Sequence, residues 1–253
     1  VNVALSKVFG ANEIKVGAQY KRFPIRESFR FGITDPGFND PESDGYNPNL
    51  APYDLTRGGT LFDFNASRGG RYAAGFVQDT LKWKDLTVNA GLRYDGNHLF
   101  RSESLLQPRL GLAWFLPATK TVLRAAYDRT LITPEYENIL LSSSAAAAAL
   151  VPPDVQESRQ LGFGQLFNVS ERHSSYNVGL QQAIGSGLRL DLSYWKRTVE
   201  NSADQDQFFN TGIVFPLNFK GADLNGWNAR IDAAPYKGLR GYLSLGHVHA
   251  LYK

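Results

Sequence analysis

Few side chains of this sequence could do chemistry, and the histidines are the first to consider. There are four of them, at His98, His173, His247 and His249. In an extended segment His247 and His249 would lie on one face of a strand, which is half of the ligand set that a zinc site needs. Because no third ligand lies close in the sequence, we expect a polar strand end here and no metal site.

A second candidate is the acidic pair Asp204 and Asp206, in a polar segment. Two carboxylates beside a histidine could act as acid and base in peptide hydrolysis. Spacing alone gives no such geometry, and charged loop residues are usually just solvated. The sequence also contains no phosphate-binding glycine loop, serine elbow or zinc signature. We therefore expect no catalytic residue, no cofactor-binding residue and no cofactor, and keep a protease only as the third of three hypotheses.

Composition sets wider limits on the class of protein. The chain has 253 residues, of which 43% are hydrophobic, 13% aromatic and 20% charged, with 24 glycines and no cysteine. No apolar run is long enough for a transmembrane helix. The net charge of +3 is spread along the chain, so we expect no nucleic-acid partner. The chain begins at Val1 and contains no methionine, so we expect a processed form or a fragment.

The elements that must position these side chains are strands. Between residues 86 and 95 apolar and polar residues alternate, with Leu92 and Tyr94 on one face and Arg93 and Asp95 on the other. Stretches of about ten residues with this period suit tilted strands that cross a bilayer. We expect about ten strands, near residues 1–9, 13–23, 72–83, 86–95, 109–116, 121–129, 176–184, 188–197, 225–235 and 238–252.

The connections between these strands alternate between short and long. Tight turns rich in Gly, Pro, Asn and Asp are expected at 10–12, 84–85, 117–120, 185–187 and 236–238. Long connections are expected at about 24–71, 96–107, 130–173 and 198–223, the third with a low-complexity stretch at 142–149. This layout is typical of outer-membrane barrels, with periplasmic turns and extracellular loops. The fold class is therefore all-β, a transmembrane antiparallel up-and-down β-barrel.

The positions of aromatic residues support a membrane-spanning wall. Interfacial belts of aromatic side chains mark both ends of such barrels. The alternative is cross-strand aromatic packing in a soluble sandwich. We expect an extracellular belt of Tyr20, Tyr94, Tyr127 and Tyr194, and a periplasmic belt of Phe9, Trp83 and Trp114.

Four segments resemble a known family. They are RYAAGFVQDTLKW (71–83), LTVNAGLRYD (86–95), QPRLGLAW (107–114) and TVLRAAYDR (121–129). The first two look like the paired strands YAAFVQDTW and LTLNAGLRYD of TonB-dependent receptors, and the others like their SPRLGLAY and TVLRASYGR strands. The resemblance is specific over about 70 residues and looser from residue 172 to 252.

This resemblance implies a 22-stranded barrel that contains an N-terminal plug and takes up scarce nutrients, such as iron chelates, cobalamin or glycans, with energy supplied by TonB. It implies outer-membrane lipid, an unknown small-molecule ligand and the TonB system as partners, the last through a plug that this sequence does not show. The sequence also lacks a terminal aromatic residue, so we expect an internal portion of a larger barrel. A small closed ten-stranded pore or structural barrel is the second hypothesis.

Two arginines stand out among the residues that form the polar face of the strands in these motifs. Arg93 and Arg109 lie beside glycines, where a large cation has room. We expect them to stabilise the inner wall through ion pairs with Asp95 or Asp128. The residues that bind the ligand are not assigned from sequence, and we expect them in the extracellular loops and the lumen.

Overall fold

A computed structural model describes residues 1–136, 139–142, 144, 169–207 and 214–253. It contains twelve strands in this part of the chain, ten of which form one antiparallel sheet. The sheet consists of β1 (Asn2–Phe9), β2 (Asn12–Phe31), β3 (Phe62–Trp83), β4 (Leu86–His98), β5 (Ser102–Leu116), β6 (Thr121–Ile132), β7 (Glu171–Ile184), β8 (Leu188–Glu200), β11 (Gly221–Tyr236) and β12 (Leu239–Tyr252). The short strands β9 (Ala203–Gln207) and β10 (Val214–Asn218) pair with each other.

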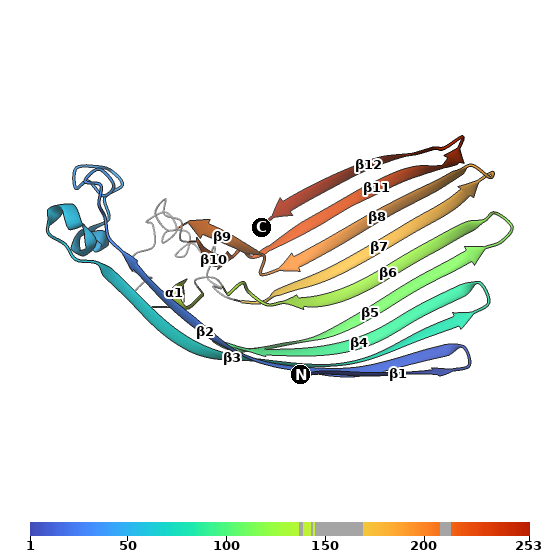
Figure 1. Cartoon of the computed structure of the whole chain (residues 1–253), viewed down its shortest axis with the longest axis horizontal. Coiled ribbons are helices and arrows are strands. Elements are labelled where there is room, and N and C mark those ends of the chain that lie inside the picture. The colour runs from blue at the N-terminus through green and yellow to red at the C-terminus, as the bar shows by residue number, and fades with distance from the viewer. Residues whose placement is uncertain (137–138, 143, 145–168, 208–213) are drawn as a thin grey trace.

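The ten strands follow one another in an up-and-down order and form a curved wall (Figure 1). All ten expected strands are present. In this sheet β1 pairs only with β2, and β12 only with β11, so both edges are open. The structure therefore does not form the closed ten-stranded barrel of the second hypothesis.

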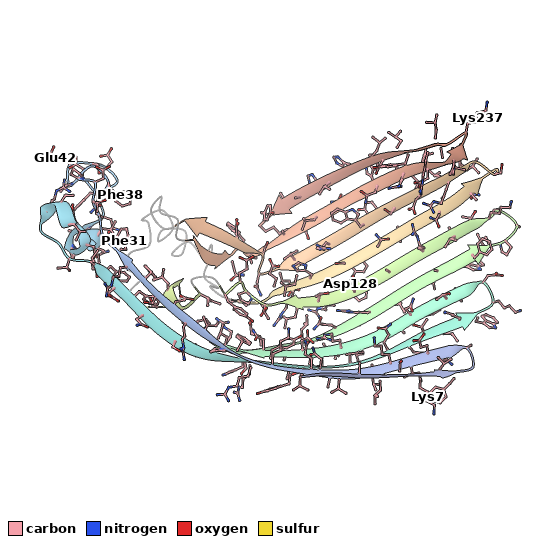
Figure 2. All side chains as sticks on the ribbon, viewed as in Figure 1. Lys7, Phe31, Phe38, Glu42, Asp128 and Lys237 are labelled. Carbon is pink, nitrogen blue, oxygen red and sulfur yellow. The ribbon has the colours of Figure 1, made fainter. Side chains whose placement is uncertain are left out.

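The expected tight turns all join neighbouring strands and lie together at one end of the wall (Figure 1). Lys237 and Gly238 both have positive φ angles, of 49° and 82°. A two-residue turn of this kind matches the twist of the flanking strands, and glycine adopts it without strain. Figure 2 shows Lys237 at this end, with Phe38 and Glu42 at the opposite end of the molecule.

Two of the long connections are shorter than expected. The strands β2 and β3 pair as far as Phe31 and Phe62, so only residues 32–61 of the expected loop 24–71 join them. Likewise only residues 99–101 lie between β4 and β5, in place of a loop at 96–107. Both segments carry turn-forming residues within extended structure: Pro24 pairs with Gly69 inside the β2–β3 ladder.

The connection between β6 and β7 holds one described helical turn, α1 (Ile139–Ser142). Most of the low-complexity stretch at 142–149 lies outside the described residues. No helix in the described part of the chain is long and apolar enough to cross a bilayer.

The extension of β2 and β3 beyond their neighbours, which we call the arm, carries the main hydrophobic core. The arm ends in two short 3-10 helices, η1 (Pro48–Tyr53) and η2 (Leu55–Arg57). Aromatic side chains on one face of the arm pack against η1 and α1, which places these segments over that face (Figure 1). The buried cluster consists of Phe31, Ile33, Leu50, Phe62, Phe64, Leu99, Ile139, Leu140 and Leu141.

The wall has two chemically different faces. We call the face that carries Arg93, Asp95 and the core of the arm the inner face, and the other the outer face. Direct cross-strand partners share a face, so the register places the four tyrosines of the expected belt on the outer face. Two further members that we did not predict, Tyr176 and Trp227, pair with Tyr127 and Tyr194. The rings of Tyr127 and Tyr176 lie 4.9 Å apart.

The second belt also lies on the outer face, beside the tight turns. Phe9, Trp83 and Trp114 are 51%, 60% and 47% exposed. Lys84 lies with its Nζ 5.6 Å from the ring of Trp83. Two belts separated by apolar side chains are the pattern of a wall that faces lipid on one side.

Candidate ligand-binding site on the inner wall

A network of polar side chains lies on the inner face where β3 and β4 pair. Arg93 Nε lies 2.6 Å from Asp95 Oδ1. Arg93 Nη2 donates to the hydroxyl of Tyr72 at 2.8 Å, and that hydroxyl donates to Asp95 Oδ2 at 2.9 Å. The expected ion pair of Arg93 with Asp95 is confirmed, with Tyr72 as a third member. The three side chains hold each other in a fixed geometry because every member contacts the other two.

The local sequence explains this arrangement. Arg93 and Asp95 are two residues apart on β4, so both point to the inner face. Tyr72 reaches them because its direct partner across the strands is Asn97, one inner position beyond Asp95. Gln19 of β2 extends the network, since its Oε1 lies 3.4 Å from Arg93 Nη2.

A hollow of about 900 Å³ lies next to this network, between β2, β3 and the segment after β6. Its volume is within the range of small-molecule sites, roughly 300–1,000 Å³. The ring of Phe23 stacks on that of Tyr136 with centroids 4.9 Å apart. Lys21 lies with its Nζ 5.9 Å from the ring of Tyr72. The lining thus combines aromatic faces with two cations, Lys21 and Arg22, and Tyr72 belongs to both the hollow and the polar network.

Inner polar side chains also anchor the chain that borders the hollow. Gln107, which is 1% exposed, accepts a hydrogen bond from the backbone N–H of Leu131 at 3.3 Å. Further along, Glu27 of the arm accepts from the N–H groups of Leu140 and Leu141, both at 2.9 Å. Buried N–H groups need such acceptors, so these contacts hold the β6–β7 connection against the wall.

The other arginine singled out from sequence behaves differently. Arg109 and Asp128 are direct cross-strand partners on the inner face, yet no ion pair joins them. Asp128 instead accepts a hydrogen bond from Thr130 Oγ1 at 3.1 Å. The inner wall has other ion pairs, namely Arg124 with Asp191 at 2.7 Å and Arg189 with Asp232 at 3.1 Å.

The histidines do not come together. His98 Nδ1 contacts Ser102 Oγ at 2.8 Å, and His173 Nε2 contacts Glu171 at 2.8 Å. His247 lies on the outer face opposite Trp227, and His249 is two residues further along the same edge strand. Within the described ranges, no three side chains are placed to hold a metal ion.

The acidic pair is only partly visible. Asp204 lies in β9, across from Leu217 of β10. The side chain of Asp206 lies outside the described part of the structure, so the geometry of the pair is not tested.

Sequence reasoning missed most of the members of this site. Gln19 and Tyr72 alternate onto the inner face of their strands, so the sequence pattern could have predicted the face on which they lie. Tyr136 lies beyond the end of β6, where no periodic pattern operates. Its contact with Phe23 could be found only in three dimensions.

Comparisons with known proteins agree with the architecture. Residues 4–250 match the family model described as TonB dependent receptor-like, beta-barrel. A search of curated proteins gives no match.

Solved structures show the same fold at low sequence identity. The FrpB iron transporter from Neisseria meningitidis (F3-3 variant) is 15% identical over 99% of this chain and 35% of its own, with a TM-score of 0.62. The copper transporter OprC is 12% identical, with a TM-score of 0.64, and the match covers 98% of this chain and 36% of OprC. The pyoverdine outer membrane receptor FpvA from Pseudomonas aeruginosa is 14% identical, with a TM-score of 0.57, and the match covers 100% of this chain and 35% of FpvA. The chain thus spans about a third of the length of these structures.

Proposed function

Because the chain belongs to the family of TonB-dependent receptor-like β-barrels, we propose that it forms part of the wall of a receptor that takes up a scarce nutrient. The family consists of transporters and receptors, and the chain is an outer-membrane protein of Gram-negative type. The proposed portion extends over residues 1–253, and other strands pair with the free edges of β1 and β12. Open edges cannot face hydrocarbon, since each unsatisfied backbone group there costs several kcal/mol.

The tight turns lie on the periplasmic side in this proposal, and the arm projects outward. Short periplasmic turns with longer external connections are the usual arrangement of such barrels. The hollow beside Tyr72 then opens toward the interior of the barrel, below the arm. A ligand entering from outside passes the arm before it reaches the inner wall.

The observation that carries the proposal is the hollow itself. Its aromatic lining suits planar or apolar groups of a ligand, and the cations Lys21 and Arg22 in that lining favour a negatively charged one. An anionic metal chelate combines these properties. FrpB is described as an iron transporter and FpvA as bound to pyoverdine. We therefore propose a metal chelate of the siderophore type as the transported ligand, in preference to cobalamin or a glycan.

Energy for uptake comes from TonB in this proposal, through a plug that contacts the inner wall. The family name supports this coupling. The ion pairs of the inner wall are fixed charges that a plug can bind, and these contacts are weak enough to exchange because they are partly hydrated.

Uptake of radiolabelled iron by cells that express the native protein tests the proposal. The probes are ferric enterobactin and ferric pyoverdine, with labelled cyanocobalamin as a third arm, each measured with and without functional TonB. Uptake of one probe should depend on TonB and fall at least several-fold in the variant Tyr136→Ala, which removes half of the aromatic stack. The control Glu42→Gln alters the distant end of the arm (Figure 2) and should leave uptake unchanged. Equal uptake with and without functional TonB contradicts the proposal. A Tyr136→Ala variant that takes up the probe as fast as the wild type contradicts it as well.

A further inference from the structure

Two arginines face each other on the outer face of the wall without an acid between them. Arg22 of β2 and Arg71 of β3 are direct cross-strand partners, and both are exposed. Neither forms an ion pair with any residue that the structure describes. On the other side of Arg71, its direct partner on β4 is His98. Like charges in this position destabilise a sheet unless something neutralises them.

The level of these basic residues along the strands is informative. Tyr20 precedes Arg22 by two residues and so lies just below it on the same face, within the outer aromatic belt. The same two-residue step recurs from Tyr127 to Arg129 and from Tyr194 to Lys196. Interfacial tyrosines mark the depth of the lipid headgroups, so the cations lie at or just above that depth.

The surface beside Arg71 is hollowed. A pocket of about 370 Å³ is lined by Tyr20, Arg71, Tyr94, His98, Ser102 and Ser104, among others. Glu103 also lines it, but its carboxylate accepts hydrogen bonds from the backbone N–H and the hydroxyl of Ser170. The acid is therefore engaged on the inner side of the strand and does not neutralise Arg71.

We propose that Arg22, Arg71 and His98 bind the phosphate of a membrane lipid headgroup on the outer face of the barrel. Guanidinium groups match phosphate in charge and in bidentate geometry. The serine hydroxyls of the pocket supply further donors, and the acyl chains continue downward over Tyr20 and Tyr94. Arg22 also lines the ligand-binding hollow, whereas Arg71 and His98 lie outside its lining.

The source of the phosphate is a lipid and not a free anion, for two reasons. The pocket lies directly above a row of exposed aromatic side chains that favour the bilayer interface. Exposed arginines alone bind a free phosphate only weakly in water, because such pairs are screened and solvated. A lipid adds the burial of its chains to the same charged contact.

Native mass spectrometry of the native protein in neutral detergent tests this site. The probes are dioleoylphosphatidic acid, dioleoylglycerol with the same chains and no phosphate, and inorganic phosphate. Phosphatidic acid should bind, and the variant Arg22→Gln/Arg71→Gln should weaken that binding by about 25-fold, or roughly fivefold per cation. The matched control Lys15→Gln/Lys82→Gln removes two cations from the inner face of the same strands and should leave binding within about twofold of the wild type.

The variant Arg22→Lys/Arg71→Lys keeps both charges and should retain most of the affinity, which separates loss of charge from loss of folding. Equal binding of dioleoylglycerol overturns the proposal, because the phosphate would then be irrelevant. Inorganic phosphate that binds as tightly as the lipid overturns it in favour of a free-anion site. Loss of binding in the inner-face control overturns it as well.

Discussion

Asp95 is almost completely buried, and Arg93, two residues before it on the same strand, neutralises it from 2.6 Å. The carboxylate is 6% exposed and the guanidinium 21%. Taking one partner away leaves a charge with little access to water, which costs more than the net contribution of the intact pair.

The first prediction concerns this pair. The variant Arg93→Gln should lower the free energy of unfolding by about 3 kcal/mol, because Asp95 loses its counter-charge. The double variant Arg93→Gln/Asp95→Asn should recover more than half of that loss. Guanidinium titration of the protein in lipid vesicles measures both. Equal losses in the single and double variants would mean that the charges do not interact.

The second prediction concerns the two faces of the wall. Leu192 lies on the outer face between the belts, and its neighbour Ser193 lies on the inner face. The variant Leu192→Arg should cost about 2–4 kcal/mol because an arginine there faces hydrocarbon, whereas Ser193→Arg should cost much less. Folding yields in vesicles compare them. A larger defect in Ser193→Arg would reverse our assignment of the faces.

The third prediction concerns an acid on the apolar face. Asp79 of β3 lies on the outer face between Ile14 and Ala90, and its Oδ1 is buried without a hydrogen-bond partner. Replacing it by valine should raise the free energy of unfolding by about 1–2 kcal/mol, since an unsatisfied polar group is removed. The matched variant Thr80→Val on the inner face loses a hydrogen bond to Asn89 and should not stabilise. A destabilised Asp79→Val variant would point to a partner that binds the carboxylate.

The position of Ala90, directly across from Asp79, allows a test of whether the Asp79 carboxylate is unpaired on the outer face. The variant Ala90→Arg places a guanidinium directly across from Asp79. It should therefore be tolerated better in the wild-type background than beside Asp79→Val. Identical costs in both backgrounds would show that the two positions do not meet.

The fourth prediction concerns pH and the arm. The hydrogen bond from the Thr56 hydroxyl, with further ones from the Thr56 N–H and Arg57, lowers the pKa of Asp54 below its ordinary value. A carboxylate with a lowered pKa stabilises the fold above its unfolded pKa, and this contribution is lost as pH falls through the folded value. The protection of the amides in residues 48–58 against hydrogen exchange, relative to the intrinsic exchange rate at each pH, should therefore fall below about pH 4. In the variant Asp54→Asn that loss of protection should be smaller.

The strands were predictable from sequence because period-two alternation is a local property. Leu92, Arg93, Tyr94 and Asp95 already show which side chains share a face, so the ion pair on β4 followed from spacing alone. The register between strands is not local. For this reason Tyr72 was not recognised as a partner of Arg93, although the alternation places both side chains on the inner face.

The arm was mispredicted for a related reason. Pro24 and the glycines at 69 and 70 indicate a turn when each segment is considered by itself. They continue a strand here because β2 is unpaired on its other side beyond Tyr20, where a missing N–H costs no ladder bond. The glycine at 70 also accommodates the ring of Phe23, which a Cβ atom would meet at 2.3 Å.

The up-and-down order of the wall has a consequence for how the protein is built. Nearly every strand pairs with the strand that precedes it in the chain, so each hairpin can form as soon as its second strand is available. Three pairings have to bridge long connections: β2 with β3 across residues 32–61, β6 with β7 across 133–170, and β8 with β11 across 201–220. The entropy of closing a loop grows only slowly with its length, so none of these steps has a large extra entropic cost. Assembly can advance along the chain one hairpin at a time, from either edge.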